Sequence, residues 1–329
     1  MKKQWFGKTL VVLILICLAL PAGASLAFEP ENPECIAPAG PGGGWDFICR
    51  TTAKNLFQLG LIDHAMQVTN MSGGGGGVAF AHVTKERNND NDLIVAASTS
   101  TAARLAQGIY KGANADSVYW LATFGAEYGV LAVKQDSQYK NLKELMDAVV
   151  ANPRSVAFAG GSSVGGFDHI KPMLVARKAG LKDVRQLKYV AYSGGGEAMT
   201  GLLSGSVQVM SGDFSELRGF YESGDVRILA ILAPNRLKGF PDIPTAKEQG
   251  YDVIGANWRG LYMPKGASEE AKEFWTNAIR KMTESEAFQK DLEAKAIEPF
   301  NNFGADMDKF AKESIKEIAD LSREIGILK

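Results

Sequence analysis

The stretch Ala37–Cys49, which reads APAGPGGGWDFIC, decides the fold that this sequence predicts. A short extended run, Glu34–Pro38, leads into a turn rich in glycine, and a helical pattern starts at Trp45. Glycine has no Cβ, so the backbone N–H groups of such a turn can approach a ligand closely. The start of the following helix adds unpaired N–H donors and partial positive charge. One such turn alone favours a plain strand-to-helix connection over a ligand site.

The same unit of strand, glycine-rich turn and helix recurs three more times, and this recurrence favours an anion-binding site. The further strands are Met66–Asn70, Ser155–Ala159 and Lys188–Ala191, and their turns are Gly73–Gly77, Gly160–Gly166 and Ser193–Gly196. Helices are predicted at Val78–Glu86, from the third turn through Ala179, and at Glu197–Leu203. Such units predict an α/β architecture with sheets covered on both faces. In open sheets of this kind, ligands bind at the carboxyl ends of the strands.

The remaining pattern predicts further elements around these units. Strands are expected at Leu93–Ala97, Val118–Phe124, Val130–Val133, Val207–Met210 and Arg227–Leu232, and helices at Asp46–Leu59 and Leu142–Val150. The hydroxyls that follow the first of these strands, Ser98 to Thr101, are typical of helix caps and also of ligand contacts. The C-terminal part predicts helices with charged solvent faces at Ser268–Thr283, Ala287–Lys295 and Ala305–Glu324, and a strand at Glu298–Phe300.

The N-terminus has the pattern of a cleavable secretory signal peptide. Lys2, Lys3 and Lys8 precede the apolar run Leu10–Leu20, and small residues follow up to Ser25-Leu26-Ala27. The run is too short for a comfortable membrane span, and Ile16 is too bulky for lipid attachment at Cys17. We therefore expect cleavage after Ala27 and export to the periplasm.

Composition narrows the class of protein further. The mature chain of about 300 residues is long enough for two domains with their own cores. The formal net charge of −1 does not predict a nucleic-acid footprint. Two cysteines remain after cleavage, Cys35 and Cys49, on either side of the first turn. In an oxidising compartment they form either a disulfide or two buried thiols, and spacing alone does not decide which.

The sequence offers one rival enzyme motif. Gly161–Gly165, GSSVG, matches the Gly-x-Ser-x-Gly elbow of α/β-hydrolases in the right strand–turn–helix context. That fold needs a histidine far downstream, whereas His169 follows Ser163 by six residues and no histidine comes later. A triad in that order cannot be assembled, and His169 is interpreted as a structural helix residue. Three scattered histidines and two cysteines also form no metal-ligand spacing, so neither metal nor cofactor is predicted.

Taken together, the glycine-rich blocks resemble a known family. The blocks are Pro41–Asp46 with Arg50, Gly73–Gly77, Gly161–Gly165 with His169, Tyr192–Gly196, Arg227–Leu232, Pro241–Thr245 and Trp258–Pro264. In this order they resemble the periplasmic solute-binding receptors of tripartite tricarboxylate transporters (the Bug-type receptor family), and most of all the tricarboxylate-binding type. Two departures are the run of five glycines and Trp45, where many relatives carry a small polar residue.

The resemblance implies a periplasmic binding protein type II-like fold, with two α/β lobes around a ligand cleft. It implies lobe 1 at 28–128 plus 259–329 and lobe 2 at 129–258, with 1–27 as signal peptide. The crossings are expected near Gly129 and Trp258, and the C-terminal helices are expected to return to lobe 1.

The resemblance also implies the binding site. In the family, ligand carboxylates are held mainly by backbone N–H groups and hydroxyls, while Arg50 and Arg104 are here assigned to surface or structural pairs. Asp46 is either a helix cap or a ligand-facing group. The candidate ligand-binding residues are Gly42, Gly43, Gly44, Trp45, Asp46, Gly74, Gly75, Gly76, Gly77, Ser98, Thr99, Ser162, Ser163, Gly165, Gly166, Tyr192, Ser193, Gly194, Gly195 and Asp213.

The expected function is a monomeric receptor without a cofactor. It would capture a di- or tricarboxylate, citrate-like, and deliver it to the large and small membrane subunits of the transporter. Two alternatives are a ligand-presenting sensor domain for a membrane kinase and a serine hydrolase using Ser163.

Overall fold

The structure is a computed structural model that describes residue 1 and residues 28–328, so the predicted signal peptide lies outside the described residues apart from Met1. The strands are β1 (Glu34–Ala37), β2 (Gln67–Asn70), β3 (Leu93–Ser98), β4 (Val118–Lys134), β5 (Ala157–Gly160), β6 (Lys188–Ala191), β7 (Val209–Asp213), β8 (Val226–Ile231), β9 (Ala256–Pro264) and β10 (Asn302–Phe303). The α-helices are α1 (Gly44–Gln58), α2 (Gly77–Lys85), α3 (Thr99–Ala106), α4 (Leu142–Ala151), α5 (Phe167–Lys178), α6 (Gly195–Leu203), α7 (Phe214–Glu222), α8 (Glu269–Glu284), α9 (Glu286–Glu293) and α10 (Ala305–Glu324). Within residues 28–328, no helix has the length and hydropathy of a membrane span.

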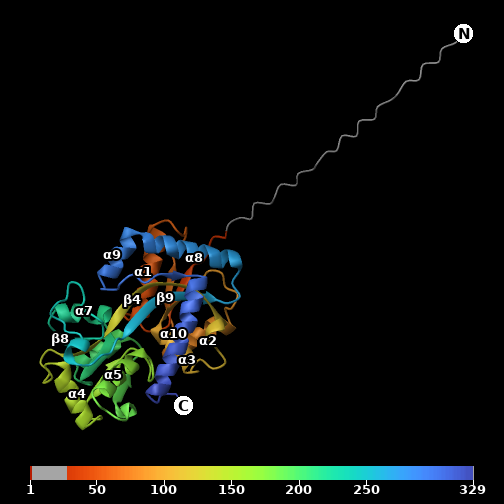
Figure 1. The fold of residues 1–329 in the computed structure, drawn as a ribbon. Helices are drawn as coiled ribbons and strands as arrows, with labels where there is room; N and C mark the ends of the chain where they lie inside the picture. Colours follow the sequence, from red (N-terminus) through yellow and green to blue (C-terminus); the bar gives the residue numbers. More distant parts are fainter. Residues whose placement is uncertain (2–27, 329) are drawn as a thin grey trace.

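The molecule has two lobes that share the long strand β4. Strand order is β2-β1-β3-β9-β4-β7-β5-β6, and β8 and β10 also pair with β4. Residues 118–128 of β4 pair with β9, whereas residues 129–134 pair with β7 and β8. Lobe 1 carries β1, β2, β3, β9 and β10 with α1, α2, α3, α8 and α9, and lobe 2 carries β5 to β8 with α4 to α7. Figure 1 shows β4 and β9 passing between the lobes.

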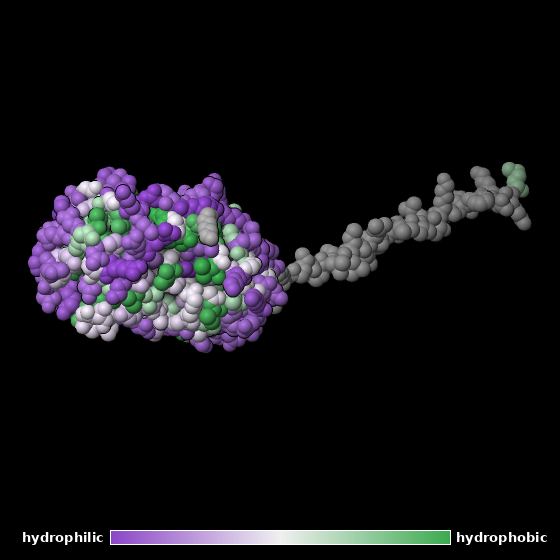
Figure 2. Space-filling view, turned by 90° about the horizontal axis from the view of Figure 1, so that it is seen from below, coloured by the Kyte–Doolittle hydropathy of each residue, from purple (hydrophilic) through white to green (hydrophobic). Residues whose placement is uncertain are grey.

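Each lobe packs helices on both faces of its part of the sheet, as the strand–turn–helix units predict. In lobe 1, Trp275 of α8 is buried against one face of the sheet, and Trp120 is buried on the other face. In lobe 2, Phe158 and Phe214 are fully buried on opposite faces. The prediction of an α/β fold with two lobes is confirmed. The face in Figure 2 is mostly hydrophilic, with hydrophobic side chains in small separate patches.

The prediction of two strands at Val118–Phe124 and Val130–Val133 is wrong, because β4 runs unbroken through both. The glycines inside β4 do not form a turn. They leave room for side chains that pack closely against the strand. A Cβ on Gly125 would lie 2.5 Å from Ile297 Cγ2, and one on Gly129 would overlap the Lys171 side chain.

Three strands meet where β4 changes partners. Gly129 N–H donates to the Gly255 carbonyl at 2.8 Å, and Leu232 N–H donates to the Gly129 carbonyl at 2.8 Å. Gly255 N–H in turn donates to the Leu232 carbonyl at 2.8 Å. The two lobes are therefore connected through a small, fully hydrogen-bonded junction.

The sequence pattern did not predict two of the helices, α3 and α7. The hydroxyls after β3 cap α3: Ser98 Oγ accepts from Ser100 N–H at 3.1 Å, and Thr101 Oγ1 accepts from Ser98 N–H at 3.2 Å. The helix α7 starts directly at the end of β7, with Asp213 as its N-cap. The short strand expected at Glu298–Phe300 lies instead at β10, while Glu298 makes an isolated bridge to Ala126.

The C-terminal helix α10 departs from the expected assignment of residues 259–329 to lobe 1. It begins on lobe 1, where Met307 and Ala311 are buried. Beyond it, Ile325 is buried in a hydrophobic cluster of lobe 2, with Leu321 packed against that cluster. The end of the chain therefore contacts both lobes.

Cys35 on β1 and Cys49 on α1 form a disulfide with a Cα–Cα distance of 5.5 Å. It ties the strand that enters the first glycine-rich turn to the helix that leaves it.

Candidate ligand-binding site

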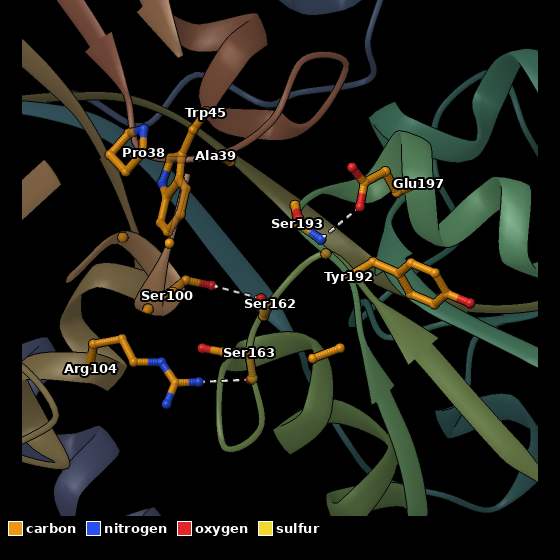
Figure 3. A pocket seen from close by; sticks show the side chains of 16 residues that line it. Pro38, Ala39, Trp45, Ser100, Arg104, Ser162, Ser163, Tyr192, Ser193 and Glu197 are labelled. Carbon is orange, nitrogen blue, oxygen red and sulfur yellow. Dashed lines mark hydrogen bonds between the residues drawn. The ribbon is translucent and has the colours of Figure 1, made fainter. Parts of the chain in front are cut away.

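A pocket of about 300 Å³ lies where loops of the two lobes meet (Figure 3). Its lobe 1 wall is Pro38, Ala39, Trp45, Gly73–Gly76, Ser100 and Arg104, and its lobe 2 wall is Gly161–Ser163, Ala191–Ser193 and Glu197. These residues follow the carboxyl ends of β1, β2, β3, β5 and β6, which is where open α/β sheets bind ligands. The four glycine-rich turns thus converge on one site.

The two walls contact each other around the pocket. Gly40 N–H donates to the Ser193 carbonyl at 3.1 Å, and Ser100 Oγ lies 3.2 Å from Ser162 Oγ. Gln107 Nε2 donates to the Gly165 carbonyl at 2.7 Å. Because these hydrogen bonds join the lobes, the conformation is closed.

Arg104 supplies a positive charge to the pocket. Its residue surface is only 2% exposed, and its guanidinium donates to the carbonyls of Ser163 at 2.7 Å and Val164 at 2.9 Å. Among the described residues, no carboxylate forms an ion pair with Arg104. Burial lowers the pKa of Arg104, and the side chain stays charged because an arginine does not deprotonate in a protein. The expected structural role of Arg104 is therefore met by hydrogen bonds to backbone carbonyls and not by an ion pair with a described carboxylate. Ser100 and Arg104 are four apart on α3 and share one face, which was the available signal.

Two donors at the pocket lack partners within the described part of the chain. Trp45 Nε1 and Ser163 Oγ are buried polar atoms without a hydrogen bond there. Buried polar groups are nearly always satisfied, so each such atom needs an explanation. A bound ligand with acceptor oxygens, or an ordered water, would satisfy both.

The turn Gly73–Gly76 has positive φ at every residue, which only glycine adopts readily. Tyr110 donates to the Gly75 carbonyl at 2.8 Å, and a Cβ on Gly75 would overlap Ser163 Oγ across the cleft. The glycine run therefore lets the lobe 1 backbone approach lobe 2 directly.

A smaller chamber of about 40 Å³ lies next to the pocket and shares Trp45 and Ser162 with it. Charged groups line or underlie the chamber, and we call Glu127, Asp168, Lys171, Asp213, Glu216 and Arg259 the buried ionic network. Lys171 Nζ lies 2.9 Å from Asp168 Oδ1 and 2.8 Å from Asp213 Oδ1. Arg259 pairs with Glu127 and with Asp213. The network fixes elements of both lobes at their junction.

The pKa values of the acidic residues in this network shift in different directions, because their charged neighbours differ. Burial would raise the pKa of Asp213, but Lys171 and Arg259 lower it. Burial raises the pKa of Glu127, which Arg259 only partly offsets. Burial, with Asp213 and Asp168 nearby, raises the pKa of Glu216 to about 8.

The structure brings most of the predicted site residues together. Those at the pocket are Trp45, Gly74, Gly75, Gly76, Ser162, Ser163, Tyr192 and Ser193. Those at the small chamber are Gly43, Gly44, Trp45, Ser98, Ser162, Gly194, Gly195 and Asp213. Six others line neither space: Gly42, Asp46, Gly77, Thr99, Gly165 and Gly166. Sequence reasoning missed the other lining residues, which are Pro38, Ala39, Gly73, Ser100, Arg104, Gly161, Asp168, Ala191, Glu197, Glu216, Asn257 and Arg259.

Asp46 braces its own turn instead of facing the pocket. Its carboxylate accepts from Gly42 N–H at 3.1 Å and from Arg50 Nε at 2.9 Å, and Asn70 also donates to it. Burial opposes ionisation, but the bonds to Arg50, Gly42 and Asn70 lower the pKa of Asp46.

The Gly-x-Ser-x-Gly motif is not arranged as a nucleophile and its base. Ser163 Oγ makes no hydrogen bond to a described residue, and His169 Nδ1 instead accepts from Gly165 N–H at 2.9 Å. Burial and the Arg104 charge lower the pKa of His169 to about 4. Residues 28–328 also contain no group of three or more His, Cys, Asp or Glu placed to hold a metal ion.

Comparisons with known proteins agree with this geometry. A family model for the tripartite tricarboxylate transporter family receptor matches residues 48–327. Among solved structures, the periplasmic binding protein BugD superposes with a TM-score of 0.82 at 21% identity, over 91% of this chain and 99% of BugD. MatC from Rhodopseudomonas palustris, with bound malate, gives 0.77 at 20% identity over 88% and 98% of the two chains. The R. palustris protein Rpa4515, with adipate, gives 0.81 at 19% identity over 90% and 97%. The fold is therefore that of the periplasmic binding proteins.

Proposed function

Since this chain belongs to the family of tripartite tricarboxylate transporter receptors, we propose that it is an exported receptor that binds a small di- or tricarboxylate between its lobes. The observation that carries this proposal is the buried Arg104 guanidinium at the pocket, which pairs with no described carboxylate. The guanidinium donates only to uncharged oxygens of Ser163, Val164 and Gln107, so its buried positive charge is not balanced by a described carboxylate, and a ligand carboxylate at this position would be stabilised.

The pocket offers donors for more than one carboxylate. Arg104 of the lobe 1 wall lies beside Ser163 of the lobe 2 wall, and Ser193 lies farther along the lobe 2 wall, as Figure 3 shows. A hydrogen bond to a charged group contributes roughly 1.5–3 kcal/mol. Four of them at the upper end of this range, less an association cost of about 4 kcal/mol, reach the roughly −8 kcal/mol of micromolar binding. The malate and adipate in the similar structures support a dicarboxylate, and a citrate-like ligand extends the same chemistry by one group.

Delivery to a membrane partner would follow from lobe movement. We place lobe 1 at 28–128 plus most of 259–329 and lobe 2 at 129–258, with the hinge at the junction of Gly129 and Gly255. A ligand that contacts both walls favours the closed form through its higher affinity for that form. The closed surface is then the signal that the large and small membrane subunits of a tripartite tricarboxylate transporter recognise. The receptor acts as a periplasmic monomer after cleavage behind Ala27.

The test is a carboxylate panel with matched arginine variants. Malate, adipate and citrate should raise the melting temperature of the wild type, because a ligand that binds only the native state stabilises it. In calorimetry, Arg104→Gln should weaken the best carboxylate by roughly 10- to 100-fold, the loss of a charged hydrogen bond. The matched control is Arg50→Gln, since Arg50 pairs with Asp46 and lines neither space. No shift with any carboxylate, or equal affinities in Arg104→Gln and wild type, would contradict the proposal.

A further inference from the structure

Two charged side chains line the pocket, one from each lobe. Arg104 on α3 of lobe 1 is the cation, and Glu197 in the first turn of α6 of lobe 2 is the anion. The other described residues that line the pocket carry no charge. Figure 3 shows the two charged side chains on opposite sides of the view, Arg104 beside Ser163 and Glu197 beside Ser193. The pocket therefore presents a positive end and a negative end to a ligand.

Glu197 already pairs with a donor that a ligand carboxylate would need at the negative end. The turn Ser193–Gly196 was expected to offer backbone N–H groups to an anion, but Glu197 Oε2 accepts from Ser193 N–H at 3.2 Å. Glu216 approaches the same turn from the other side. Its Oε1 accepts from Gly44 N–H at 3.0 Å and would lie 2.6 Å from a Cβ on Gly195. Carboxyl groups of the protein thus already occupy the start of α6, where the helix dipole favours negative charge.

The Glu197 carboxylate has capacity for a further hydrogen bond. A carboxylate offers about four acceptor sites, and the bond from Ser193 N–H uses one of them. Glu197 is exposed, and it forms no ion pair with a lysine or arginine among residues 28–328. A hydroxyl or ammonium group of a ligand can donate to it. A ligand carboxylate has no hydrogen to donate, and its charge is repelled by that of Glu197.

We propose that Glu197 determines ligand specificity by accepting a hydrogen bond from a hydroxyl or ammonium substituent of the ligand. The site then prefers a substituted dicarboxylate to the plain dicarboxylate of the same length. One ligand carboxylate lies at Arg104, and the substituent lies at Glu197, so the ligand contacts one charge on each lobe. The proposal rests on the proposed function, because it assumes a carboxylate ligand in this pocket.

Calorimetry with succinate, malate and aspartate at pH 7 tests this preference. The three acids share one carbon skeleton and differ at the second carbon, which carries hydrogen, hydroxyl or ammonium. The wild type should bind aspartate about tenfold more tightly than succinate, the low end for a hydrogen bond to a charged group, with malate in between. Glu197→Gln keeps an acceptor for Ser193 N–H, so its melting temperature without ligand should match that of the wild type. It should bind aspartate about tenfold more weakly and succinate at least as tightly as before.

The matched control is Glu222→Gln, which removes an exposed negative charge from the same lobe but lines neither space. It should leave the ratio of the three affinities unchanged. Equal affinities of the wild type for the three acids would overturn the role of Glu197 while leaving the receptor function intact. The same would follow if Glu197→Gln changed all three affinities by one factor, since a distant charge acts on every anion alike. Absence of binding with all three acids and with adipate would instead count against the proposed function and overturn this proposal with it.

Discussion

At the scale of single residues, Gly43, the N-cap of α1, and Gly195, the first residue of α6, differ in the space around them. A Cβ on Gly43 would lie 3.5 Å from Gly195 N, an ordinary contact, whereas a Cβ on Gly195 would lie 2.6 Å from Glu216 Oε1. Added bulk in a packed site typically costs 1–3 kcal/mol, about 10- to 100-fold in affinity when it falls on the bound state. We expect Gly195→Ala to weaken carboxylate binding by about tenfold or more, with Gly43→Ala close to wild type, measured by calorimetry on folded variants.

Ser163→Ala is the useful comparison for that pair. It removes one hydroxyl at the pocket and should cost less affinity than Gly195→Ala. A serine hydrolase would show the reverse order, with Ser163→Ala abolishing an activity. Unchanged affinity in Gly195→Ala would show that this turn is only a connection.

His169 makes a residue-scale prediction about stability and pH. Burial and Arg104 lower its pKa to about 4 in the folded state, against about 6.5 in an unfolded chain. Between pH 6.5 and about pH 4, His169 binds a proton in the unfolded state but not in the folded state. The free energy of unfolding therefore decreases as the pH is lowered through this range. At about 1.4 kcal/mol per pKa unit, the loss is about 3 kcal/mol at most. Urea denaturation at pH 7.5 and pH 4.5 should show a smaller acid loss in His169→Phe, and an equal loss in both proteins would refute this cause.

At the scale of elements, the disulfide holds the first turn in place. Cys35 and Cys49 are separated by 14 residues and join β1 to α1 directly beside Trp45. A loop of this length stabilises a protein by about 3 kcal/mol in the chain-entropy account. The double variant Cys35→Ala/Cys49→Ala should lose stability on that order, and it should also bind a carboxylate more weakly, because the start of α1 becomes less ordered.

Thiol titration gives the direct check on the bridge. The unfolded, unreduced mature protein should show no free sulfhydryl, and two free sulfhydryls would mean that the bridge does not form in solution. Equal stability of the double variant and the wild type would contradict the stabilising role.

The sequence predicts an element well where its residue pattern is regular, and poorly where distant parts of the chain determine it. The helix expected at Ala305–Glu324 has the observed bounds because its apolar period and polar face are both regular. The break expected inside β4 failed, since Gly125 and Gly129 are there to accept Ile297 and Lys171 from distant parts of the chain. Such contacts have no local signature.

The residues of the site also divide into those that a local pattern predicts and those that depend on long-range contacts. The glycine-rich turns can be predicted from the sequence, because a backbone that approaches a ligand or another loop closely needs glycine in either case. Arg104 and Glu216 stand in ordinary helical surroundings, and only the tertiary fold shows that Arg104 has no described ion pair and that Glu216 crosses the cleft. Side-chain contacts between residues far apart in the sequence are therefore the part of the site that could not be predicted from local patterns.

At the scale of the whole molecule, the lobes are joined by more than the crossing of β4 and β9. Figure 1 shows α10 running beside α3 toward lobe 2. At its end, Arg177 of α5 donates to the Glu324 carbonyl at 2.6 Å, and Ile325 is buried among lobe 2 side chains. Nε2 of Gln107, the C-cap residue of α3, lies 3.4 Å from Ser322 Oγ. Opening of the cleft must either bend this helix end or detach it, so α10 opposes opening.

Two isoleucines near the C-terminus allow an experiment to distinguish the contact between α10 and lobe 2 from a general effect on stability. Ile325 packs into the lobe 2 cluster and Ile318 into the lobe 1 cluster, and both are nearly buried. Replacing either with alanine should cost about 2–4 kcal/mol of stability, the usual range for a buried isoleucine. Only Ile325→Ala should also enlarge the radius of gyration of the ligand-free protein and weaken carboxylate binding, since it releases α10 from lobe 2. X-ray scattering and calorimetry on both variants, at a temperature where both are folded, provide the measurement. Identical scattering and affinity in the two variants would show that the lobes close without this brace.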